Sequence, residues 1–195
     1  PDSTIAYPYC WKECEVLDNG PLRFTAKLVY NPLVIKGDSN VVETRVISLD
    51  KGSQLNKTVI SYTDLKEVTP IVAGIVIHKE NPTGYSFDSN AGYIAYADST
   101  QNPRNNNGVI YVGAVFPASL NAAKAQLFPE AERKEHGGAL GHVLGISDYE
   151  PGTEYVYYWG FRMEQIWFCQ PMTEWTKYLE NFAQQVRNPL TVTVK

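Results

Sequence analysis

Hydrophobic and polar residues alternate along much of the first half of the chain, which is the pattern of half-buried β-strands. Residues 22–30 show the alternation most clearly, with Phe24, Ala26 and Leu28 on one face. Four other segments are predicted to form strands, at residues 40–48, 57–62, 91–97 and 108–116. Residues 70–78 are apolar on both faces, which predicts a central strand of a sheet.

Helical periodicity replaces this alternation in the second half of the chain. Residues 118–128 are helix-like, and Pro129 suits the first position of a second helix that would run to about Leu144. Gly145 then stands where a left-handed residue commonly ends a helix.

The clearest helical pattern lies at residues 173–187, where five apolar residues form one stripe. The stripe consists of Trp175, Tyr178, Leu179, Phe182 and Val186. Strands followed by helices predict an α+β fold, with one mixed β-sheet covered by helices. We expect a single domain over residues 1–195, β-rich at 1–89 and bearing the helices at 90–195.

The composition restricts the partners of this protein. Hydrophobic residues make up 44% of the chain, as in globular proteins. The net charge of −4 argues against nucleic acid, and no apolar segment reaches the ~20 residues of a membrane span. The many Tyr, Trp and Asn residues favour a secreted protein. Cys10, Cys14 and Cys169 fit either one disulfide or three free thiols.

One segment carries candidate chemistry: EHGGALGHVLGISD, residues 135–148. On a helix, Gly138 and His142 lie four residues apart and share a face. A turn at Gly145 would bring Asp148 back toward that face. This is the spacing of the metal-binding pattern H-E-x-x-H-x-x-G-x-x-H/D.

The stretch GALGHVLGISD resembles the zinc-binding motif of the metzincin metallopeptidases, in the form that ends in Asp. CQPM, which ends at Met172 before the terminal helix, resembles the methionine turn of that family. Residues 91–116 resemble the strands that line its substrate cleft. The resemblance implies a zincin-like fold with an active-site helix, a peptide or protein substrate, and zinc held by His142 and Asp148 with a third ligand at position 138.

The motif departs from the family at two positions. The first histidine of the family falls on Gly138, which has no ligand atom. The catalytic glutamate falls on Ala139, which cannot take a proton from a metal-bound water. The resemblance therefore implies a degenerate site with little or no proteolytic activity, from which the zinc could be lost.

Two alternatives remain open at this point. If the chain breaks at the double glycine, His136, His142 and Asp148 could hold zinc in an active peptidase, with Glu135 or Glu132 as the base. The protein could instead be a non-catalytic, secreted peptide- or glycan-binding protein.

Simpler structural roles fit the same residues. His142 could be a core histidine bonded to a carbonyl, and Met172 a core residue. His78 could face solvent at a strand end. The aromatic segment Tyr155–Phe161 is most simply packing, whereas exposed aromatic rings there would indicate a sugar or peptide cleft.

Overall fold

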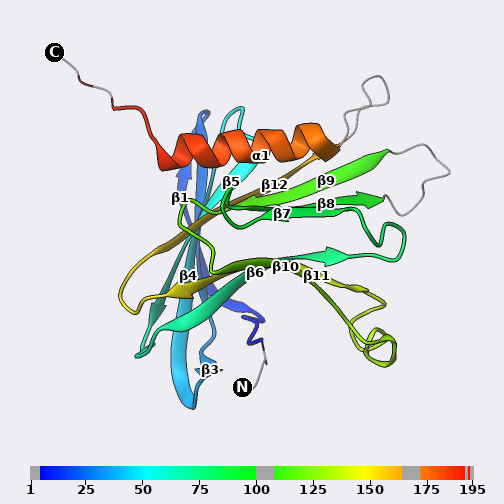
Figure 1. The fold of residues 1–195 in the computed structure, drawn as a ribbon. Coiled ribbons are helices and arrows are strands. Elements are labelled where there is room, and N and C mark those ends of the chain that lie inside the picture. Colours follow the sequence, from blue (N-terminus) through cyan, green and yellow to red (C-terminus); the bar gives the residue numbers. More distant parts are fainter. Residues whose placement is uncertain (1–4, 100–107, 164–171, 192, 194–195) are drawn as a thin grey trace. The chain divides into compact units, whose positions relative to one another are not determined.

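The computed structural model describes residues 5–99, 108–163, 172–191 and 193 (Figure 1). Within these residues the chain is mostly antiparallel β-sheet with one α-helix. The elements in chain order are β1 (Trp11–Asn19), β2 (Arg23–Tyr30), β3 (Leu33–Ile35), β4 (Asp38–Asp50), β5 (Leu55–Thr63), β6 (Thr69–Ile77), β7 (Tyr85–Asp88), β8 (Tyr93–Ser99), β9 (Val109–Val115), β10 (Ala122–Leu127), a 3₁₀ turn η2 (Glu130–Glu132), β11 (Gly141–Tyr149), β12 (Tyr155–Met163) and α1 (Met172–Arg187).

The strands predicted in the first half of the chain are confirmed by β2, β4, β5, β8 and β9, and the terminal helix by α1. The two helices expected at residues 118–128 and 129–144 are wrong. These residues form β10, a short 3₁₀ turn and the start of β11, and β10 pairs with β11 in antiparallel register. Pairing between strands outweighs the helix propensity of the Ala- and Leu-rich segment. The α+β, metzincin-like fold is therefore wrong, and the fold is β-rich.

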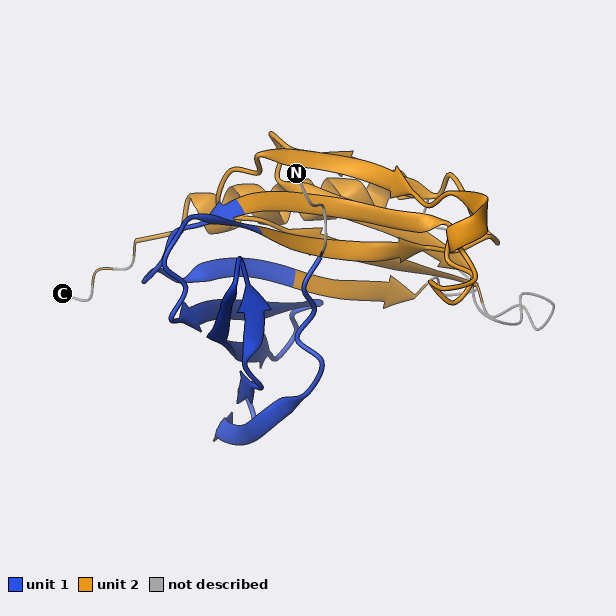
Figure 2. Ribbon diagram, turned by 90° about the horizontal axis from the view of Figure 1, so that it is seen from below, with its two compact units in different colours: residues 1–70, 148–158 blue, residues 71–147, 159–195 orange. Residues whose placement is uncertain are grey.

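The chain divides into two compact units (Figure 2). Unit 1 contains residues 1–70 and 148–158, and unit 2 contains residues 71–147 and 159–195. Strand β12 contributes residues 155–158 to unit 1 and 159–163 to unit 2.

Unit 1 is built on a sheet in the order β1-β2-β4-β5-β12, with β3 paired to the first part of β4. The pairing of β2 with β4 explains the alternation seen in the sequence. Ala26 lies opposite Ile47 on one face, and Thr25 lies opposite Ser48 on the other. The face that carries Ala26 and Ile47 also carries the buried residues Val41, Glu43 and Ile60, so it is the more buried face of this sheet.

Unit 2 has three layers. One sheet runs β12-β9-β8-β7, and a second sheet runs β10-β11-β6. In Figure 1, α1 lies on one side of β8 and β9, and the second sheet lies on the other side. This explains why both faces of β8 are buried over its first five residues. The strand predicted at residues 70–78 is confirmed by β6, but β6 stands at one end of its sheet, so the predicted central position is wrong.

Helix α1 is held against the first sheet of unit 2 by side chains near both of its ends. The indole Nε1 of Trp175 donates a 3.1 Å hydrogen bond to the carbonyl oxygen of Val112. Gly113 leaves room for the helix, since a Cβ there would lie 2.6 Å from Leu179. At the other end, the Arg187 guanidinium donates to three backbone carbonyl oxygens, those of Asn90, Phe116 and Pro117. The apolar stripe and this last arginine together fix the helix on the sheet.

Candidate functional site

The glycines of the motif belong to a turn and a strand. Gly137 and Gly138 have φ angles of +66° and +86°, in the left-handed region that favours glycine. They end the irregular segment that leads into β11. Gly145 lies within β11, where a Cβ would come within 2.7 Å of the Phe116 ring. Backbone turning therefore accounts for Gly137 and Gly138, and close packing accounts for Gly145.

The predicted zinc ligands lie on this turn and on β11. His136 and Glu135 are exposed in the turn, and Ala139 after it is buried. His142 and Asp148 lie six residues apart on the same strand, and six residues of strand span about 20 Å. A strand thus separates two ligands that the predicted helix would have brought together. Among the described residues, no group of three His, Cys, Asp or Glu side chains could hold a metal ion.

The remaining predicted features of the zinc site are placed as follows. Met172 is half-buried and opens α1. The segment before it, including Cys169, lies outside the described residues. Cys10 and Cys14 are both free and exposed.

His136 and His142 do come near each other, through an aromatic contact. The ring of Phe128 stacks on His136 with 3.8 Å between centroids, and meets His142 edge-on at 5.1 Å. Burial lowers the pKa of His142, and the positive charge of His136 lowers it further. A lowered pKa keeps His142 neutral near pH 7, and its role here is packing against Phe128.

His78 has a carboxylate partner that the sequence did not reveal. Its Nδ1 lies 3.0 Å from both carboxylate oxygens of Asp98, which comes from β8. The hydroxyl of Tyr96 accepts the backbone N–H of His78 and donates to the carbonyl oxygen of Asn81. In the neutral tautomer whose Nδ1–H points to Asp98, Nε2 would be the acceptor that a general base needs. A proton acceptor alone does not define a reaction, because it needs groups that polarise a substrate.

An exposed apolar row lies on the second half of β12, in unit 2. Its members are Trp159, Phe161 and Met163, which are 39%, 58% and 50% exposed. Alternate residues of a strand point to the same face, so these three side chains project together. Gly160, between the first two, is buried. The sequence predicted that exposed aromatic residues in this segment would indicate a binding cleft rather than core packing.

In unit 1 a buried glutamate pairs with a half-buried arginine. Glu43 is 1% exposed, and its neighbour on the same face of β4, Arg45, donates Nε–H to its carboxylate. The sequence indicated that Glu43 and Arg45 share a face, because they stand two positions apart among apolar residues of a predicted strand. The alternation of hydrophobic and polar residues does not show whether such a pair is buried on the core face or simply interrupts the hydrophobic pattern.

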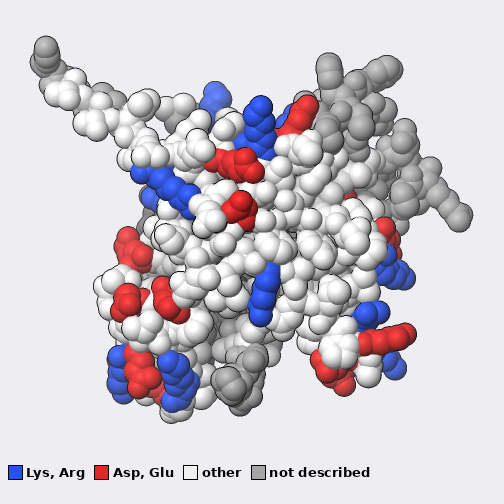
Figure 3. Space-filling model, in the orientation of Figure 1, with Lys and Arg blue, Asp and Glu red and all other residues white. Residues whose placement is uncertain are grey.

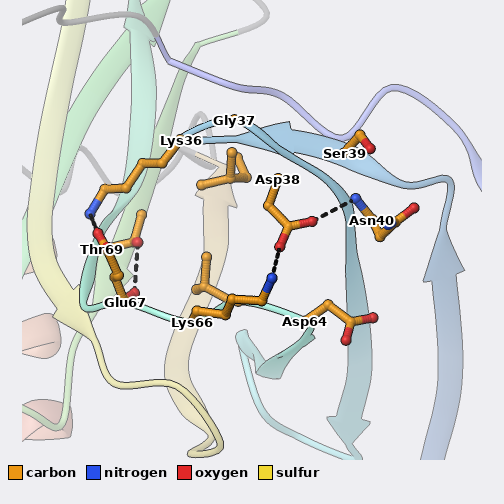
Figure 4. A pocket seen from close by; sticks show the side chains of 11 residues that line it. Lys36, Gly37, Asp38, Ser39, Asn40, Asp64, Lys66, Glu67 and Thr69 are labelled. Carbon is orange, nitrogen blue, oxygen red and sulfur yellow. Dashed lines mark hydrogen bonds and ion pairs between the residues drawn. The ribbon is translucent and has the colours of Figure 1, made fainter.

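A hollow of about 460 Å³ in unit 1 lies between the β3–β4 turn and the loop before β6 (Figure 4). Four of its charged groups form two ion pairs: Lys66 lies 3.0 Å from Asp38, and Lys36 lies 3.5 Å from Glu67. The backbone N–H of Asn40 and the ammonium of Lys66 both lower the pKa of Asp38. A ligand would have to displace these ion pairs. We therefore interpret the hollow as part of a turn that the ion pairs stabilise, and not as a binding site.

Charge is dispersed over one face of the molecule. On the face shown in Figure 3, acidic and basic side chains are interspersed, with no large patch of one sign. This agrees with the modest net charge of −4. No helix in the described ranges has both the length and the apolar character needed to cross a lipid bilayer.

These features define a β-rich protein with an exposed aromatic row and a histidine–aspartate pair. The chain belongs to a family described as a domain of unknown function (DUF4861), whose model matches residues 1–192. That description names no activity. No curated protein and no solved structure matches the chain.

Proposed function

We propose that this protein is a non-catalytic glycan-binding protein, and that its binding surface is the β12 apolar row of Trp159, Phe161 and Met163. The observation that supports the proposal is the exposure of two aromatic rings on the same face of one strand. Large apolar side chains grouped at a surface are typical of binding sites.

The chemistry of the row suits a sugar. The face of an aromatic ring carries partial negative charge, which attracts the C–H groups on the flat face of a sugar ring. Side chains two positions apart on a strand are separated by about 6.6 Å, so each ring can meet a different sugar unit of a chain. The modest net charge of −4 makes a highly charged polymer a less suitable ligand.

The zinc peptidase hypothesis loses its main support, since its active-site helix is absent and its ligand positions fall on a turn and a strand. The His78–Asp98 pair does not restore a hydrolase, because no residue that the structure describes beside it identifies a substrate or a group to polarise one.

The proposal is tested by affinity electrophoresis in gels that contain soluble neutral polysaccharides, such as β-glucan, galactomannan and xylan. The wild-type protein should be retarded by at least one of them. The double variant Trp159→Ala, Phe161→Ala should migrate as in a gel without polysaccharide, because it lacks both rings.

The matched control is Phe87→Ala, which removes another partly exposed phenylalanine ring, on β7 of the same unit. This variant should be retarded like the wild type. Absence of retardation in every gel, or equal retardation of the double variant, would overturn the proposal. Binding of peptides but not polysaccharides through Trp159 would replace it with a peptide-binding function.

A further inference from the structure

The buried charged pair of unit 1 is surrounded by tyrosines. The carboxylate of Glu43 accepts Nε–H from Arg45 and, at 2.8 Å, the hydroxyl of Tyr62. The ring of Tyr62 in turn meets Tyr149 edge-on at 4.9 Å. Burying an ion pair costs free energy that its own attraction often fails to recover. A fully enclosed carboxylate in this position therefore calls for a reason other than stability.

Arg45 uses only part of its hydrogen-bonding capacity within the protein. Its Nε donates to Glu43, but neither Nη atom donates to any residue that the structure describes. The two Nη atoms are also not completely buried. The Arg45 side chain is 26% exposed, and the enclosed side-chain atom found without a partner in the described ranges is Ser99 Oγ. The outer edge of the guanidinium, with its two parallel donors, therefore has no partner among the described residues and is not fully enclosed.

The open edge is held rigidly. The guanidinium carbon of Arg45 lies 5.0 Å from the centre of the Tyr30 ring, within the range of a cation–π contact. Glu43 fixes the other edge of the same planar group. Burial acts to lower the pKa of Arg45, but the charge and hydrogen bond of Glu43 outweigh it and raise the pKa, so the group stays charged. A charged guanidinium that is already held in place loses little conformational freedom when a ligand binds.

We propose that the open Nη edge of Arg45 is a binding site for the carboxylate group of a small ligand. The two coplanar oxygens of a carboxylate match the two parallel N–H donors of the fork. Glu43 already cancels the formal charge of Arg45, so recognition depends on this geometry more than on net charge, which disfavours multiply charged anions. The site lies in unit 1 and stands independently of the glycan-binding row in unit 2.

The test is a titration of the full-length protein with acetate and benzoate, followed by NMR chemical shifts, at constant ionic strength. Saturable shifts are expected for the signals around Arg45. Arg45→Met should weaken the affinity at least tenfold. Arg45→Lys keeps the charge but loses the planar guanidinium, so it should weaken the affinity by a similar factor. The lysine variant also provides the test if the methionine variant does not fold.

Arg23→Met is the matched control. Arg23 also pairs with a carboxylate, that of Asp50, but this pair is exposed on the neighbouring strands β2 and β4. Its removal should leave the titration unchanged. Shifts that never saturate, or an equal loss in the Arg23 variant, would overturn the proposal. Tighter binding of phosphate or sulfate than of acetate would overturn the assignment to a carboxylate.

Discussion

His142 shows how a single residue can fit two quite different sites. In the sequence it occupies the second ligand position of a zinc motif. In the structure it is half-buried on β11 against the edge of Phe128, and His136 stacks on the face of the same ring. The spacing of six residues between the histidines is compatible with contact here only because a turn and not a helix joins them.

The lowered pKa of His142 gives a prediction about pH. Because the folded protein holds this histidine less protonated than the unfolded chain does, stability should fall as the pH drops below about 6.5. His136→Phe keeps a ring against Phe128 but removes the positive charge. In this variant the pKa of His142, measured by NMR titration, should rise toward its ordinary value without reaching it, because burial is the larger cause.

The urea midpoint of the His136→Phe variant should also fall less between pH 7.5 and pH 5.5 than that of the wild type. A pKa of His142 that is unchanged by the substitution would show that the two histidines do not interact.

At the scale of single elements, α1 is the part that the sequence predicted most fully. Its apolar stripe repeats with the period of a helix, and Trp175, Leu179 and Ala183 are the residues that the structure buries. What the stripe packs against was not predictable. The partner surface is β8 and β9, where Gly113 leaves space that a larger residue would fill.

We predict that Trp175→Ala destabilises the protein by about 3–5 kcal/mol, since it removes a buried aromatic side chain and its hydrogen bond to Val112. Urea unfolding followed by circular dichroism measures the change. Lys177→Ala, at an exposed position of the same helix, should change the free energy of unfolding by no more than about 0.5 kcal/mol. Similar effects of the two substitutions would mean that α1 is not anchored through Trp175.

At the scale of the whole molecule, the β-rich fold changes the meaning of the motif at residues 135–148. The zinc motif of the metzincins depends on a helix that places ligands one turn apart. The chain here passes through a turn with two left-handed glycines and then extends as β11. Residues that match the motif by spacing therefore do not share one face.

The double variant Gly138→His, Ala139→Glu tests this conclusion. In a metzincin-like fold it would rebuild the first ligand and the catalytic base. In the present fold it should bind no stoichiometric zinc, because position 138 lies in a turn and six residues of strand part His142 from Asp148. Elemental analysis after dialysis against zinc measures the metal content, with the wild type as the control. One zinc per double-variant chain would return the metzincin hypothesis to favour.

The sequence by itself determined the elements whose signal is local. Strands such as β2 and β4 follow from the local alternation of single residues, and α1 follows from its stripe. Tertiary structure decided β10 and β11, since Ala, Leu and Gly give no local preference strong enough to resist pairing between strands. The tertiary structure also decided which ionisable and polar side chains contact one another. The Asp98 partner of His78 comes from twenty residues away, and the tyrosine around Glu43 comes from a neighbouring strand. Such contacts depend on strand register and on the packing of sheets, and no spacing along the chain encodes them.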